Sequence, residues 1–94
     1  MKVSWTRPTK DDRTAIFDYI EAENPRAAVK LDRLFERAVE QISQFPYTGR
    51  VGQIDGTREA VPHPNYRLVY SVADDTVYIL GLFHAARQWP PETL

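Results

Sequence analysis

The chain has no cysteine among its 94 residues, which excludes a disulfide framework and any thiolate metal site. Two histidines without cysteine do not make a convincing transition-metal site. The sequence also lacks a glycine-rich phosphate loop and a serine, histidine and aspartate arrangement for nucleophilic catalysis. It therefore predicts a protein that holds neither a metal nor another cofactor.

Long apolar runs are missing as well. The longest, "VYILGLF" at residues 77–83, is far too short to cross a bilayer. The opening stretch, "MKVSWTRPTKDD", lacks the apolar core of a secretion signal. Because the absence of cysteine suits a reducing compartment, we expect a cytoplasmic protein without membrane contact.

Neither sign of charge dominates the chain. It carries 12 Lys and Arg residues against 13 Asp and Glu residues, for a net charge of -1. Binding to nucleic-acid backbones normally needs a clustered positive surface. We therefore expect no sequence-specific DNA binding by this chain alone, while a local arginine cluster stays open.

The composition that is present, 43% hydrophobic and 12% aromatic, predicts one globular domain over residues 1–94. A short amphipathic helix is expected from about Pro8 to Asn24. A longer one follows, because Asn24 can cap it, Pro25 suits its first turn and Pro46 ends it. Its expected apolar stripe, which should pack in the core, is Ala28, Leu31, Phe35, Ala38, Ile42 and Phe45.

Short alternating runs predict strands at residues 2–6, 57–62, 66–72 and 77–83. The glycine-rich stretch "YTGRVGQIDG" is expected to be a loop. The order β-α-α-β-β-β predicts an α+β fold, in which an N-terminal antiparallel helical hairpin packs on one face of a small antiparallel sheet.

The last two strands are predicted to pair around a symmetric turn at Asp74 and Asp75. This pairing sets Arg67 opposite Leu82 and turns Gly81 and Phe83 towards the helices. On the other face it makes Arg67 and His84 diagonal neighbours, within reach of one bound group.

Five stretches carry a family signature in a fixed order. They are "NPRAA", "FPYTGRVG", "GTREAV", "YRLVYSV" and "VYILGLFHAARQWP", and together they cover nearly the whole chain. Each is weak alone, but the ordered set resembles the RelE/ParE superfamily of bacterial toxins, and the ParE branch more than RelE itself. The resemblance implies a type II toxin that is neutralised by a cognate antitoxin, whose carboxy-terminal segment wraps it.

The resemblance also implies two targets. ParE-like members poison DNA gyrase, whereas RelE-like members cut messenger RNA on the ribosome. The neutral charge and the ParE-like motif order favour a toxin that binds and poisons gyrase without chemistry of its own. Arg87, Trp89 and Arg58 are then the candidate target-binding residues, since Trp beside Arg is typical of a protein-binding hot spot.

The alternative is an enzyme, a metal-independent and ribosome-dependent endoribonuclease. It needs a base for the ribose 2'-hydroxyl, a cation for the phosphate and an acid for the leaving oxygen. By resemblance, His84 and Arg67 match a catalytic histidine and a phosphate-binding arginine, and Glu59 is a candidate base. The residue after His84 is Ala85, where the related nucleases carry a tyrosine.

Each candidate also has a purely structural interpretation. His84 can bind a backbone group at a strand end, Arg67 can pair with Glu59, and Trp89 can pack the tail onto the domain. A degenerate toxin that keeps only antitoxin binding is a third function that the sequence allows.

Overall fold

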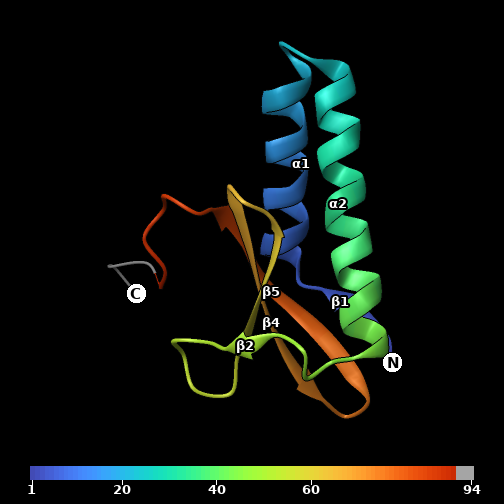
Figure 1. The fold of residues 1–94 in the computed structure, drawn as a ribbon, viewed down its shortest axis with the longest axis vertical. Coiled ribbons are helices and arrows are strands. Elements are labelled where there is room, and N and C mark those ends of the chain that lie inside the picture. Colours follow the sequence, from blue (N-terminus) through green and yellow to red (C-terminus); the bar gives the residue numbers. More distant parts are fainter. Residues whose placement is uncertain (91–94) are drawn as a thin grey trace.

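The computed structural model describes residues 1–90, in which two helices pack against one face of a five-stranded sheet (Figure 1). The elements in chain order are β1 (Lys2–Trp5), α1 (Arg7–Glu21), α2 (Pro25–Gln44), β2 (Arg50–Val51), β3 (Arg58–His63), β4 (Tyr66–Ala73) and β5 (Thr76–His84). The predicted α+β fold with its helical hairpin is confirmed.

Both helices begin where the sequence supplies a start signal. A proline stands in the first turn of each, where its missing N–H costs no hydrogen bond. At the start of α2 the Asn24 side chain accepts a hydrogen bond from the Ala27 N–H at 3.1 Å. The helix ends at Gln44, two residues before Pro46.

An ion pair joins the two helices of the hairpin. Arg13 of α1 donates to both carboxylate oxygens of Asp32 on α2, at 2.6 and 2.8 Å. Its guanidinium lies 4.8 Å from the centre of the Trp5 ring on β1. The hydrogen bond with Asp32 raises the pKa of Arg13. Through its contacts with Asp32 and Trp5, the guanidinium links both helices to the edge of the sheet.

The sheet is mixed, which differs from the antiparallel sheet that the sequence predicts. Its strand order is β1-β5-β4-β3-β2, and β1 pairs with β5 in parallel. A short hairpin loop can join only antiparallel strands. Because both helices lie between β1 and the later strands in the chain, no such loop constrains β1, and it can pair in parallel. The stretch expected as a loop also contains the two-residue strand β2, which pairs with β3.

The core lies between α2 and the helix-facing side of the sheet. Its buried side chains come from α2, β4 and β5, namely Leu31, Phe35, Val39, Ile42, Leu68, Tyr70, Val77, Ile79 and Leu82. Two predicted members of the α2 stripe are wrong. Val39 takes the buried place expected for Ala38, and Phe45 is 57% exposed because it follows the end of the helix.

The pairing of β4 with β5 contains one irregularity. Near the turn it follows the predicted symmetry, with Val72 opposite Val77 and Tyr70 opposite Ile79. The next pair is Val69 with Gly81, which leaves Leu80 as an extra residue in β5. Such a β-bulge reverses the face of every later side chain on its strand.

The bulge overturns the predicted faces beyond it. Arg67 pairs with Phe83 instead of Leu82, and His84 pairs with Tyr66. Gly81 and Phe83 therefore lie on the face away from the helices, and Leu82 and His84 lie on the helix side. Arg67 and His84 are on opposite faces of the sheet, so they are not the diagonal neighbours that the sequence predicts.

The hydroxyl of Tyr70 holds the loop that follows α2. It donates to the Pro46 carbonyl at 2.7 Å and accepts from the Gly49 N–H at 3.0 Å. Tyr70→Phe leaves both groups without this partner, so we expect the free energy of unfolding to fall by about 1–3 kcal/mol. Urea unfolding measures this loss, and Tyr19→Phe, at a site 82% exposed, should show none.

Burial raises the pKa of Tyr70 above the ordinary value of 10.0. The folded state therefore favours the protonated hydroxyl, and this contribution is complete below pH 10.0 and lost as the pH rises through the raised pKa. The decline should be shallower in Tyr70→Phe, where only Tyr66 keeps a pKa raised by burial. Equal decline in both proteins would contradict the role given to Tyr70.

Candidate functional site

The predicted site residues lie on two separate surfaces. The helix side of the sheet carries His84 at the end of β5, beside the helical hairpin. The other side, which we call the open face, carries Arg67, Glu59 and Trp89. The three groups proposed for RNA cleavage are therefore not assembled around one point.

His84 forms a turn that ends β5. Its Nδ1 accepts a hydrogen bond from the Ala86 N–H at 3.0 Å, and its carbonyl accepts from the Arg87 N–H at 2.9 Å. The Ala85 N–H donates to the Asn65 carbonyl at 2.8 Å. Since Nδ1 is an acceptor, neutral His84 carries its proton on Nε2. This geometry matches the structural interpretation, in which the histidine binds backbone at a strand end.

Glu59 is 6% exposed and lies between two arginines on the open face. The Glu59 Oε1 is 3.2 Å from Nη2 of Arg50 and 3.9 Å from Nη1 of Arg67. The pairing of Arg67 with Glu59 is thus present, and Arg50 is a partner that the sequence did not indicate. The Glu59 carboxylate is therefore already engaged by two arginines and nearly closed off from solvent.

Trp89 packs onto the open face. Its ring stacks on that of Phe83, with centroids 4.9 Å apart and an interplanar angle of 13°. It also covers Gly81, and the residue is partly buried. The ring is thus a packing group, although its role in target binding stays a prediction.

The two remaining candidates, Arg58 and Arg87, differ in whether their side chains already have partners within the chain. The Nη1 atom of Arg58 donates to the carbonyls of Tyr47 and Gly49, at 3.1 and 2.7 Å, and its guanidinium lies over the Tyr47 ring. The Arg58 guanidinium thereby binds the loop that follows α2. Arg87 is exposed, so its side chain is available to a partner.

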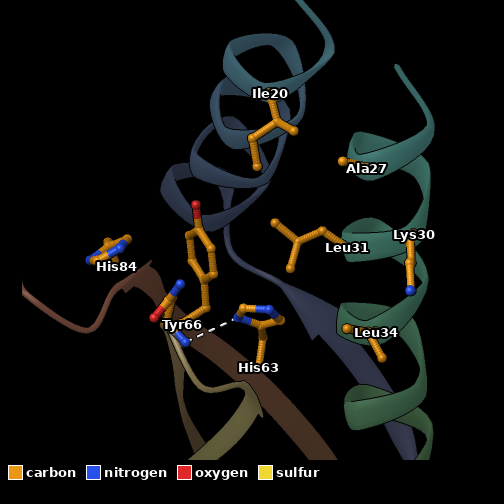
Figure 2. Close-up of a pocket in the computed structure, with 9 residues that line it drawn as sticks. Ile20, Ala27, Lys30, Leu31, Leu34, His63, Tyr66 and His84 are labelled. Carbon is orange, nitrogen blue, oxygen red and sulfur yellow. Dashed lines mark hydrogen bonds between the residues drawn. The ribbon is translucent and has the colours of Figure 1, made fainter. Parts of the chain in front are cut away.

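A groove of about 360 Å³ separates the helical hairpin from the turn between β3 and β4 (Figure 2). Tyr66 points into it, with His84 on one side and His63 on the other. The Tyr66 ring centroid is 5.3 Å from that of His84 and 6.0 Å from that of His63. The helices contribute four apolar residues to its lining, Ile20, Ala27, Leu31 and Leu34, and Lys30 and Asn65 complete it.

The sequence gives no sign of this groove, because its lining comes from separate elements that only the fold brings together. The bulge at Leu80, which brings His84 to the helix side, could not be seen in the apolar pattern.

The exposed face of α2 carries a row of cations next to the groove. They are spaced 4, 3 and 4 residues apart, so they share one side of the helix, and they are Arg26, Lys30, Arg33 and Arg37. None of the four forms an ion pair with another described residue. Lys30 and Leu34 line both the groove and the neighbouring hollow along the row, so the two regions are continuous. This is the local arginine cluster that the net charge left open.

Over residues 1–90, neither helix combines the length and the apolar character that a membrane span requires. Within the same residues, no group of three or more His, Asp or Glu side chains is arranged to hold a metal ion.

The fold matches solved toxin structures. The chain is similar to the "Chromosomal ParDE TA system from P. aeruginosa", with a TM-score of 0.72 and 23% identity over 89% of this chain and 95% of that one. It is also similar to the "YoeB/ParE toxin from Agrobacterium tumefaciens", with a TM-score of 0.65 and 15% identity over 89% and 98% of the two chains. At these identities the likeness shows the fold alone, which this chain shares with both structures.

Sequence comparison defines the family. Residues 3–89 match the family described as ParE toxin of type II toxin-antitoxin system, parDE. The chain is 37% identical to Toxin RelE2 of Caulobacter vibrioides, over 92% of this chain and 97% of the relative. It is 34% identical to Putative toxin Y4kP of Sinorhizobium fredii, over 95% and 93%.

This chain therefore belongs to the ParE toxin family and is the toxin component of a type II toxin-antitoxin system. Such a toxin has an antitoxin as its partner.

The ion pairs of the buried Glu59 side chain yield a test of its structural role. Glu59→Gln removes the negative charge between Arg50 and Arg67, whose side chains are 58% and 40% exposed. Because both cations can return to water, we expect the free energy of unfolding to fall by only about 1–2 kcal/mol. Urea unfolding measures the loss, and Asp55→Asn in the exposed loop is the control. Unchanged stability in Glu59→Gln would contradict the structural role.

Proposed function

We propose that this toxin arrests growth in the cytoplasm by binding and poisoning DNA gyrase, without covalent chemistry of its own. The observation that carries the proposal is the separation of His84 from Arg67 on opposite faces of the sheet. Metal-independent RNA cleavage needs a proton-transfer group and a phosphate-binding cation around one phosphate. The resemblance to the ParE branch then favours gyrase over the ribosome.

The state of Glu59 supports the same proposal. Its carboxylate is almost fully buried against Arg50 and Arg67, so the arginine expected to bind phosphate already has a partner. The exposed Arg87 is the remaining candidate with a free side chain, so we assign it to the gyrase contact.

We further propose that the antitoxin covers the groove and the adjacent cation row of α2. The groove offers apolar surface beside the aromatic ring of Tyr66, and the row offers unpaired positive charge. A segment with apolar anchors and acidic residues complements both features. This surface lies on the helix side, away from the open face that carries Trp89.

A gyrase supercoiling assay tests the target. Purified protein without antitoxin, added to gyrase, ATP and relaxed plasmid, should reduce supercoiling and produce linear plasmid, because a trapped enzyme leaves its DNA cleaved. No effect by folded protein at large excess, together with cleaved transcripts after induction in cells, would replace this proposal with the nuclease.

His84→Asn sharpens the distinction between the two mechanisms. An asparagine side chain accepts a hydrogen bond from the N–H two residues on, as His84 does from Ala86, but it cannot transfer protons near neutral pH. The variant should therefore keep its toxicity within roughly twofold, as is usual for changes below about 0.5 kcal/mol. Loss of an acid or base would instead lower the rate by about 10²–10⁴-fold.

Ala27→Glu tests the antitoxin surface. Ala27 lines the groove at the third position of α2, where glutamate favours a helix capped by Asn24, so the variant should fold while its side chain obstructs the groove. We expect antitoxin to bind about 10-fold or more weakly, which is at least about 1.4 kcal/mol by calorimetry. Ala15→Glu on the exposed side of α1 is the matched control. Equal affinity of both variants would show that the antitoxin binds elsewhere.

A further inference from the structure

The segment of residues 85–90 leaves the end of β5 and returns over the open face. The turn at His84 reverses the chain through the bonds of Ala86 and Arg87 to the histidine. Two residues after Arg87, the Trp89 ring stacks on Phe83, which belongs to the strand that the chain has just left. Arg87 thus lies between two fixed points, the turn and the stacked ring.

Gly81 makes room for this stacking. A Cβ atom at position 81 would lie 3.1 Å from Cη2, 3.3 Å from Cζ3 and 3.6 Å from Cζ2 of Trp89. These three nearest atoms all belong to the outer ring of the indole. The first two distances are shorter than ordinary carbon contacts, so any side chain here displaces the ring.

The strand itself has no need of glycine at this position. Gly81 directly follows the extra residue Leu80 and pairs with Val69, but its φ angle is not in the left-handed region, so the bulge does not require a glycine here. Within an antiparallel ladder a β-branched residue is favoured and glycine weakens the strand. We call the contact of Gly81, Phe83 and Trp89 the tryptophan latch. Its geometry accounts for the glycine, whereas strand formation does not.

We propose that Gly81 is a positioning residue for the toxic contact: it admits Trp89 to the open face, and the closed latch holds Arg87 in the orientation that binds the target. The proposal rests on the proposed function only in the identity of the target. It differs from a direct role of Trp89, because here the indole acts by holding the segment in place.

Gly81→Val opens the latch without removing any group that touches the target. Trypsin should then cut after Arg87 ~10-fold faster, because cleavage follows the population of the open segment. Gyrase poisoning should fall by a similar factor, while antitoxin affinity stays unchanged. Ser71→Val adds the same side chain to the open face of β4, where it pairs with Tyr78, and is the matched control.

A second substitution separates positioning from direct contact. Trp89→Leu alone leaves a gap over Gly81 and should lower poisoning. Combined with Gly81→Val, the smaller leucine side chain leaves room for the added valine, and together the two fill the volume of the indole. The double variant should therefore regain most of the poisoning and the protection of Arg87 from trypsin. A double variant that regains protection but not poisoning would overturn the proposal, since Trp89 would then touch the target itself.

Two further results have defined meanings. Unchanged cleavage and poisoning in Gly81→Val would also overturn the proposal, and urea unfolding confirms that each variant is folded.

If wild-type protein fails to poison gyrase, the target is wrong. Growth arrest in cells then takes the place of the gyrase assay for the wild type, both single variants and the double variant. Loss and recovery of growth arrest in parallel with trypsin protection would still support the latch.

Discussion

The extra residue at Leu80 in β5 is the constraint on which the functional surfaces depend. Side chains alternate across a strand, so one inserted residue exchanges the two faces for everything that follows. The strand is also fixed immediately before the bulge, where the Ile79 carbonyl accepts hydrogen bonds from the hydroxyls of Thr6 and Thr9 at 2.7 and 3.0 Å. The first half of β5 therefore belongs to the core, while beyond the bulge Gly81 and Phe83 turn away from the helices.

This exchange of faces decides which of the candidate side chains lie together. Without the bulge, the symmetric pairing would set His84 and Arg67 side by side on the open face. With it, the histidine stands beside Tyr66 at the groove, and the arginine stays with Glu59. Arg50, Glu59 and Arg67 of the open face are then paired with one another, which agrees with the proposal of a toxin that acts by binding.

Much of this fold follows from the sequence, and the exceptions have physical causes. The helices were predictable because Asn24, Pro25 and Pro46 mark their ends, and the turn at Asp74 and Asp75 has the positive φ angles of a tight hairpin. The pairing of residues 66–69 with residues 81–84 was not predictable, since a bulge inside an apolar run leaves the hydrophobic pattern intact. Glycine inside a strand is a recognised sign of a bulge, so Gly81 was the one available signal. The pairing of Arg50 with Glu59 also depends on β2, which is too short for any periodicity.

The two faces give the molecule two surfaces with different physical properties. The helix side has a hollow with apolar walls and unpaired cations, which favours a long complementary segment. The open face is covered in part by the segment that returns from β5, so its contacts depend on how that segment is held. Because the sheet separates them, a substitution on one side can leave the other intact, and neutralisation need not occupy the residues that bind the target. An antitoxin bound at the groove would then act by bulk, or through His84, which belongs both to the groove and to the turn that orients Arg87.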